Sequence, residues 1–355
     1  MSSTTLAKAT PFCCPGCRKA LRLAIEDDRS VCSACGWTAR AGDGAALNFV
    51  MDPALRKEAD HYEDEYAQAR LAAPVELEAL AALWKDNPWA PFNQTIHDAL
   101  GDVRNKTMVL LGNGVSAKEL FFLTQGPRAL VYSDLSTAAV RAARDHYPQV
   151  AARDDAFFAA IDAQDLPFAD ASVGVIYGYA FVHHLPDLDR FLAEVARVLE
   201  PGGRAVFMDN SYSPLWQRAK HGWLNRAMRV SHEVDPISAE DMRYTLSGGF
   251  RSEDIKARAA AVGLDAWFEP TGTVHYLITR ASQIFAGRVP VLNLDRRTWA
   301  LQPSGSHELV VGSRRLLEAI SRVDRWLERY EVFRSNRMRL VWGLTTSEGR
   351  GDRQG

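Results

Sequence analysis

The sequence predicts an α/β fold, with a mostly parallel β-sheet that carries helices on both faces and ends in an antiparallel strand. Two observations predict the sheet: short apolar runs recur along the chain with room for a helix between them, and glycines follow the first run. Strands that alternate with helices in this way form parallel sheets. A third observation sets the first part of the chain apart, because all five cysteines lie before residue 36.

Length and composition are those of a globular protein. The chain has 355 residues, of which 47% are hydrophobic and 24% charged, so it can bury a core and about two or three domains are expected. A net charge of -2 argues against a general polyanion binder. No apolar run approaches the roughly 18 residues that span a bilayer, and the polar start does not look like a secretory signal. We therefore expect a cytoplasmic protein without a transmembrane segment.

The cysteines predict a zinc ribbon over residues 1–50. Cys14 and Cys17 form one C-x-x-C pair, and Cys32 and Cys35 form a second after 14 intervening residues. Zinc in structural sites takes four such ligands in a tetrahedron, with no open position for chemistry. Cys13 remains an alternative to Cys14. A redox-active pair is the other interpretation, but it leaves the second pair unexplained.

A helical region is expected to follow the ribbon, over residues 51–105, and to lead into the main sheet. The pattern is helical from Asp52 and is interrupted at Pro74 and at 87–91. Apolar runs then predict five buried strands, at 108–111, 129–132, 157–161, 173–177 and 204–208. Helical patterns lie between them at 117–124, 137–146 and 188–199, and 339–345 is expected to form the last, antiparallel strand.

A glycine-rich loop follows the first predicted strand. Gly112 and Gly114 allow the backbone to approach a ligand closely, and the helix that begins here offers free N–H groups. Asp134 ends the next strand, 22 residues after Gly112, where a carboxylate can accept hydrogen bonds from both hydroxyls of a ribose. These features predict an adenosine-type ligand. They fit a nicotinamide-dependent oxidoreductase as well as an S-adenosylmethionine-dependent methyltransferase.

Motifs further along the chain distinguish these two classes. Residues 162–168 read DAQDLPF, 170–173 read DASV, 183–185 read HHL and 199–203 read LEPGG. This order resembles the class I S-adenosylmethionine-dependent methyltransferases, particularly the small-molecule group typified by quinone-biosynthesis C-methyltransferases. The resemblance covers about residues 106–210. It implies a Rossmann-like methyltransferase domain over 106–355. The connection after the fifth strand is too long for a simple link and predicts a lid insertion at about 211–250, and a helical pattern predicts a second insertion at about 273–333.

The resemblance also implies which residues contact the cofactor. They belong to the glycine loop, to the ends of three strands and to an aromatic lead-in segment: Gly112, Asn113, Gly114, Asp134, Leu135, Asp162, Ala163, Tyr177, Tyr179, Tyr62 and Tyr66. Asp134 would bind the ribose and Asp162 the adenine amino group. The chain departs from the family at Leu110, where an acid is usual, and at Ser116, where a third glycine is usual.

The expected function is methyl transfer from S-adenosylmethionine to a small-molecule acceptor. Residues 211–232 mix aromatic and cationic side chains, which suits either a lid over an apolar or anionic substrate or a solvated basic face whose tryptophans pack into the core. His184, His232 and Glu233 are the candidate bases. The sequence leaves open whether carbon, nitrogen or oxygen is methylated. Two alternatives also remain: a ribosomal-RNA methyltransferase whose ribbon holds RNA, and a non-catalytic zinc-ribbon module with a decayed methyltransferase domain, which Leu110 suggests.

Overall fold

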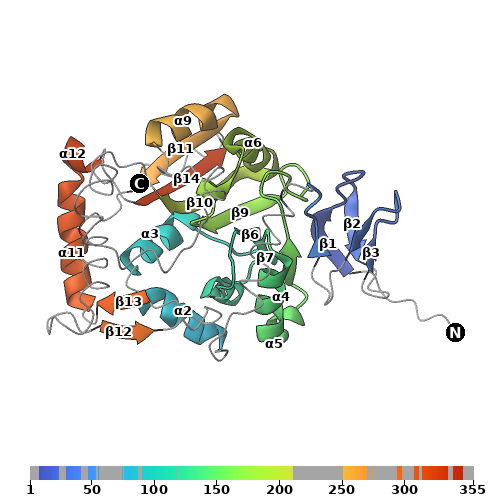
Figure 1. Ribbon diagram of the computed structural model, residues 1–355, viewed down its shortest axis with the longest axis horizontal. Helices are drawn as coiled ribbons and strands as arrows, with labels where there is room; N and C mark the ends of the chain where they lie inside the picture. Colours follow the sequence, from blue (N-terminus) through green and yellow to red (C-terminus); the bar gives the residue numbers. More distant parts are fainter. Residues whose placement is uncertain are drawn as a thin grey trace.

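The computed structural model is organised around an eight-stranded sheet with the strand order β11-β14-β10-β9-β6-β7-β8-β5 (Figure 1). The structure describes the following residues: 8–23, 29–40, 47–52, 55, 74, 76–86, 90–116, 118–210, 251–269, 274, 294–297, 308–311, 314–334 and 339–346.

Six strands form the parallel part of the sheet and two antiparallel strands extend one edge. The parallel strands are β5 (Leu47–Asn48), β6 (Thr107–Leu111), β7 (Ala129–Asp134), β8 (Ala156–Ala160), β9 (Val173–Tyr179) and β10 (Leu199–Asn210). The antiparallel strands are β11 (Leu264–Glu269) and β14 (Arg339–Thr346). The expected mostly parallel sheet with an antiparallel last strand is confirmed, whereas β5 and β11 were not predicted.

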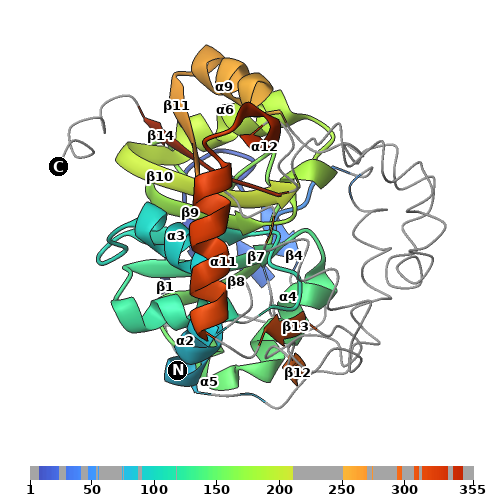
Figure 2. The ribbon, with the colours of Figure 1, turned by 90° about the vertical axis from the view of Figure 1, so that its left-hand side faces the viewer.

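Helices cover both faces of the sheet. One face carries α6 (Leu188–Val198) and α9 (Ser252–Ala261). The other carries α2 (Leu77–Asp86), α3 (Ala90–Leu100), α4 (Thr137–His146) and the 3-10 helix η1 (Lys118–Gln125). Short helices are α5 (Pro148–Ala151), α12 (Glu331–Arg334) and the 3-10 turn η2 (Val182–His184). Figure 2 shows α11 (Arg314–Leu327) crossing in front of this layer, next to α3. None of the described helices is long and apolar enough to span a membrane.

The two faces are filled by two separate apolar clusters, which follow from the alternation of side chains along a strand. In β6, Val109 and Leu111 belong to the cluster beneath α6, and Met108 and Leu110 belong to the cluster beneath α2 and α3. All five residues of β6 are buried. Central strands buried on both faces therefore read as continuous apolar runs.

Side-chain caps begin the helices that follow the parallel strands. The Ser136 hydroxyl accepts a hydrogen bond from the Ala139 amide at the start of α4, and the Asp187 carboxylate accepts one from the Arg190 amide at the start of α6. The helix expected at 117–124 is instead the 3-10 helix η1.

The N-terminal cysteine-bearing unit consists of two short hairpins at the side of the sheet (Figure 1). One hairpin pairs β1 (Lys8–Cys13) with β2 (Ala20–Leu23), and the other pairs β3 (Arg29–Val31) with β4 (Thr38–Arg40). The chain then enters β5, which pairs in parallel with β8 of the main sheet. A further hairpin, formed by β12 (Leu294–Arg297) and β13 (Glu308–Val311), lies apart from the sheet.

Candidate functional site

A cavity opens at the carboxyl ends of the parallel strands β6, β7, β8 and β9. About 820 Å³ of space between its walls is free of protein atoms, including the part that is open to solvent. Leu55 lines the cavity from the segment between β5 and β6. The other lining residues lie at or after the ends of the four strands: Leu111, Gly112, Gly114, Asp134, Leu135, Ile161, Asp162, Ala163, Gln164, Ala180, Phe181, His184, Leu185 and Pro186. Ligands bind at this edge in open α/β sheets.

The glycine loop after β6 forms the floor of the cavity. Gly112 has a φ of 60°, and a Cβ atom there would collide with Cβ of Phe181, so only glycine fits. Asn113 is buried and does not line the cavity; its side-chain amide donates to the Ser116 carbonyl oxygen over 2.7 Å. The structure therefore gives Asn113 a role in holding the shape of the loop.

Asp134 ends β7 and lines the cavity beside Leu135. Its two carboxylate oxygens accept backbone hydrogen bonds, one from the Gly114 amide at 2.7 Å and one from the Ser136 amide at 2.9 Å. These bonds tie the carboxylate to the glycine loop and fix its orientation at the strand end.

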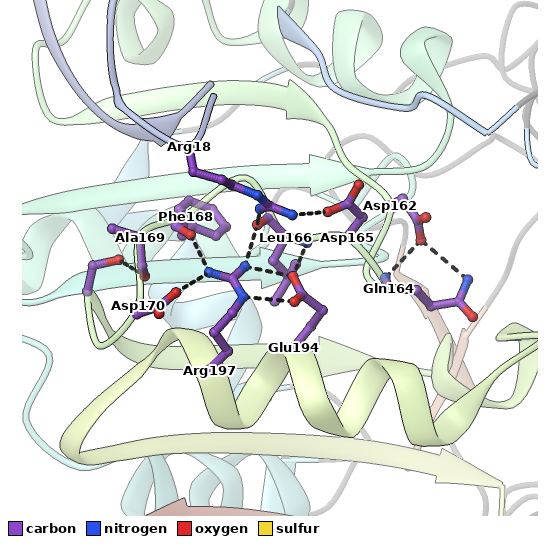
Figure 3. A network of polar contacts seen from close by, with 11 residues as sticks. Arg18, Asp162, Gln164, Asp165, Leu166, Phe168, Ala169, Asp170, Glu194 and Arg197 are labelled. Atoms are coloured by element: carbon purple, nitrogen blue, oxygen red, sulfur yellow. Dashed lines mark hydrogen bonds and ion pairs between the residues drawn. The ribbon is translucent and has the colours of Figure 1, made fainter. Parts of the chain in front are cut away.

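Asp162 and Ala163 follow β8 on the next wall of the cavity. Asp162 is only 5% exposed, and burial raises the pKa of its carboxyl group. One carboxylate oxygen accepts a hydrogen bond of 2.8 Å from the Gln164 amide (Figure 3). The Gln164 side-chain oxygen accepts one from the amide of Asp187, the N-cap of α6. The sequence prediction did not include Gln164, whose role depends on this contact with a residue 23 positions away.

The two tyrosines at the end of β9 are not among the residues that line the cavity. Tyr177 is fully buried against Trp84, with ring centroids 5.9 Å apart, in the cluster beneath α2. Tyr179 lies below the ammonium group of Lys118, which is 4.8 Å from its ring centroid. Four more of the predicted site residues lie outside the part of the chain that the structure describes: Tyr62, Tyr66, His232 and Glu233.

A histidine pair follows β9. His184 lines the cavity, and burial lowers its pKa to about 4. The ring of His183 lies 4.0 Å from that of His184, and its Nδ1 is 2.5 Å from Oδ1 of Asp209. Asp209 is fully buried near the end of β10, the strand parallel to β9. The sequence prediction missed the pairing of His183 with Asp209, although an acid at the end of the strand beside β9 is a signal that could have identified it.

The four predicted cysteine ligands form a cluster in which all sulfur atoms lie within 4.8 Å of one another: Cys14, Cys17, Cys32 and Cys35. The Sγ–Sγ distance is 3.6 Å between Cys14 and Cys35 and 3.7 Å between Cys17 and Cys32. A zinc tetrahedron with bonds of about 2.3 Å requires about 3.8 Å, so the donor set fits zinc.

The thiols of this cluster differ in how readily they ionise. Backbone hydrogen bonding, chiefly from the Ala34 amide, lowers the pKa of Cys32 to about 6, whereas burial raises the pKa of Cys14 to about 12. A bound metal ion deprotonates the thiols that coordinate it. Cys13 lies outside the cluster, and its backbone amide donates to the Pro167 carbonyl oxygen over 2.7 Å.

Comparison with known proteins identifies the central part of the chain. Residues 109–207 match a family model described as a methyltransferase domain. The chain is 32% identical over 107 residues to the ubiquinone/menaquinone biosynthesis C-methyltransferase UbiE of Acidiphilium cryptum, a match that covers 30% of this chain and 43% of the relative. It is 31% identical over 99 residues to the methyltransferase GfsG of Streptomyces halstedii, covering 28% and 36% of the two chains.

Among solved structures, the chain is similar to the geranyl diphosphate C-methyltransferase of Streptomyces coelicolor, at 16% identity and a TM-score of 0.45, over 83% of this chain and 98% of the other. The chain spans less than half the length of the curated relatives it matches. The domain match over residues 109–207 encloses the glycine loop and both aspartates of the cavity. Residues 109–207 of this chain are therefore similar to a methyltransferase domain.

Proposed function

We propose that this protein transfers a methyl group from S-adenosylmethionine to a small, apolar biosynthetic molecule. One observation carries the proposal: two aspartates from neighbouring strand ends, Asp134 and Asp162, face a single cavity within the matched domain. They follow the adjacent strands β7 and β8, so a nucleoside that lies across this edge could contact one through its ribose and the other through its base.

Different residues of the cavity would contact different parts of the cofactor. Asp134 would accept hydrogen bonds from the ribose hydroxyls, and Asp162 would accept one from the adenine amino group. The glycine loop would lie beside the methionine part. Leu110 is fully buried in the core, so this position offers no carboxylate to the ammonium group.

The chain contributes alignment and proton transfer to the reaction. When bound, S-adenosylmethionine supplies an electrophilic methyl group on its sulfonium, and the cavity aligns the acceptor and excludes water. Asp209 holds the protonated Nδ1 of His183, which leaves Nε2 as the basic nitrogen for an acceptor proton. We assign the base to His183, which does not itself line the cavity but packs on His184, which does. The pKa of His184, about 4, makes that neighbour a weak base.

Two features support an apolar acceptor. Much of the described cavity wall is aliphatic or aromatic, through Leu55, Leu111, Leu135, Phe181 and Leu185. The names of several relatives specify apolar substrates, such as the fatty-acid O-methyltransferase of Mycolicibacterium smegmatis, which is 46% identical over 61 residues and matches 16% of this chain and 22% of that protein.

We also infer that the cysteine cluster holds one zinc ion with a structural role. Four thiolates complete the coordination shell, so no ligand position is left for a substrate. The zinc ribbon is defined from here on as residues 8–40, which carry β1 to β4.

The proposal is tested by calorimetric titration of the purified protein with S-adenosylmethionine. Binding is expected for the native chain, and Asp134→Ala is expected to weaken it by about 10- to 100-fold, because a charged hydrogen-bond acceptor is lost. Asp145→Ala is the control, since Asp145 is exposed on α4 and lies outside the cavity lining. A native protein that does not bind the nucleoside, or an Asp134→Ala variant with native affinity, contradicts the assignment. Transfer of a labelled methyl group to a panel of quinol, fatty-acid and polyketide acceptors then identifies the substrate class.

A further inference from the structure

We propose that Arg18 of the zinc ribbon positions the loop that carries Asp162, so that the metal-bound ribbon sets the affinity of the cofactor site. The inference rests on the proposed function in one respect, because it takes residues 162–168 to be the adenine side of that site. It assigns to the ribbon a positioning role inside the molecule.

The backbone of Arg18 is the first observation. The two cysteine knuckles have the same hydrogen bonds: the Arg18 amide donates to the Cys14 carbonyl oxygen, and the Gly36 amide donates to that of Cys32, over 2.7 and 2.9 Å. Both residues are left-handed, with φ of 57° at Arg18 and 73° at Gly36. Glycine adopts this conformation freely, and other residues do so at a cost in free energy. An arginine at the glycine position of a knuckle indicates that its side chain has a function.

The side chain of Arg18 reaches the cofactor loop. Its Nη2 donates to a carboxylate oxygen of Asp165 over 2.7 Å, and its Nη1 donates to the Leu166 carbonyl oxygen over 3.3 Å (Figure 3). The next two loop residues also contact the ribbon, because the Pro167 carbonyl oxygen accepts from the Cys13 amide and the Phe168 ring stacks on Phe12 at 5.5 Å. Four consecutive loop residues, 165–168, are therefore in contact with the segment 12–18.

The loop connects these contacts to the cavity within one turn. The Asp165 amide donates to the Asp162 carbonyl oxygen over 3.0 Å, and the Gln164 amide donates to the Asp162 carboxylate. A shift of Asp165 therefore moves the turn that orients the Asp162 side chain.

The opposite side of the loop is held by α6. The Leu166 amide donates to the Glu194 carboxylate, and Arg197 donates to the carbonyl oxygens of Leu166 and Phe168, each over 2.8 Å. Figure 3 shows Arg18 and Arg197 approaching Leu166 from two sides. The helix supports the loop backbone, while Arg18 alone of these two arginines binds the Asp165 side chain. The zinc ribbon thus orients the Asp165 side chain, which Arg197 of α6 does not bind.

The decisive variant is Arg18→Gly, because it removes the side chain and relieves the backbone at once. If Arg18 served only the ribbon, glycine would be neutral or better. We expect the full-length variant to keep its zinc and its melting temperature, and to bind S-adenosylmethionine about two- to five-fold more weakly, the range for a partly exposed charge pair. Zinc is measured by elemental mass spectrometry and binding by calorimetry.

Three further variants define the contact. Asp165→Asn removes the partner and is expected to match Arg18→Gly, and the double variant is expected to be no weaker than either single one, since both break one interaction. Arg18→Lys keeps one donor and is expected to recover part of the affinity. Lys19→Ala is the matched control: it removes a neighbouring positive charge from an exposed side chain, which makes no hydrogen bond or ion pair with the other described residues.

Hydrogen exchange of the amides in residues 163–168 gives a readout that needs no cofactor. Faster exchange in Arg18→Gly, and in the native protein after zinc is removed by a chelator, supports the proposal. Native exchange and native affinity in a zinc-loaded Arg18→Gly protein would overturn it, as would loss of zinc from that variant. Failure of the native protein to bind S-adenosylmethionine contradicts the proposed function, while the exchange data still decide the role of Arg18.

Discussion

Gly112 and Phe181 illustrate how single residues shape the cofactor site. The left-handed backbone at Gly112 and the close approach of Phe181 to the position that a Cβ would take both exclude a side chain. We expect Gly112→Ala to lower the free energy of unfolding by about 2 to 4 kcal/mol, from overpacking and backbone strain together. Urea denaturation measures the loss. Gly126→Ala is the control, because Gly126 has a φ of 74° but a Cβ there would have no atom within 4 Å, so it should show the backbone cost alone, about 1 kcal/mol. Equal losses in the two variants would exclude a steric role for Phe181.

The pair formed by His183 and Asp209 supports a prediction about rate. His183→Ala is expected to lower kcat by about 100- to 10,000-fold, the range for a lost general base, with little change in cofactor affinity. Asp209→Asn should lower kcat in the same direction, because the asparagine side chain no longer stabilises a protonated His183 ring. The kinetics of His184→Ala provide the comparison. If that variant loses more activity than His183→Ala, the base is His184 and the assignment is wrong.

The site residues differ in how well the sequence identifies them. Asp134 and Asp162 both line the cavity, and each lies within two residues of the end of an apolar run that is long enough to identify a strand. Tyr177 does not line it, since six of the seven residues of β9 are buried and the apolar pattern gives no sign of which face a side chain occupies. Asp209 is 26 residues from His183, and only the parallel pairing of β9 with β10 brings them together.

At the scale of elements, the two knuckles of the zinc ribbon support a prediction about metal content. Cys32→Ser is expected to lower bound zinc below one equivalent, because serine is a poor ligand for zinc. Cys13→Ser is the matched control: Cys13 is also buried, with 4% exposure, but lies outside the cluster of four sulfur atoms. Elemental analysis of both purified variants distinguishes them. Retention of a full equivalent in Cys32→Ser would refute the ligand set.

The elements that the sequence predicts are those with a strong local pattern. The runs that became β6, β7, β8, β9 and β10 are continuous and apolar, and α6 places Phe191, Leu192, Val195 and Val198 on one buried face. Strand β5 has two residues, too few for any pattern. The segment 118–125 has a helical composition, but six of its eight residues are buried, including Lys118 and Glu119. Its 3-10 geometry is therefore a product of packing, which local propensity does not contain.

At the scale of the whole molecule, the partly buried His184 makes stability depend on pH. Its folded pKa of about 4 lies below the ordinary value of 6.5, so the unfolded chain binds a proton first as the pH falls. Stability is thus full above about pH 6.5 and decreases as the pH falls towards 4, by up to about 3 kcal/mol from this group. Urea denaturation across that range measures the slope. His184→Gln is expected to flatten it, and an unchanged slope would show that other groups dominate.

The overall architecture consists of a single sheet with one apolar cluster on each of its faces. The cluster beneath α6 also includes Phe12, Leu21 and Cys14 of the zinc ribbon. The ribbon therefore shares a core with the methyltransferase domain. The sequence showed the ribbon as a separate unit, because its cysteines are close together, but not this shared core, which depends on contacts between distant segments.

The pairing of β5 with β8 has a consequence for how the protein is made. The ribbon emerges from the ribosome before the main sheet, yet Leu47 of β5 pairs with Ala159 of β8, which is translated much later. Until then, the aromatic face formed by Phe12 and Phe49, whose rings are 4.9 Å apart, lacks its contacts with Phe157 and Phe168. Domains generally fold in the order of synthesis. The ribbon can therefore acquire its metal early, as a preformed surface onto which the rest of the polypeptide later assembles.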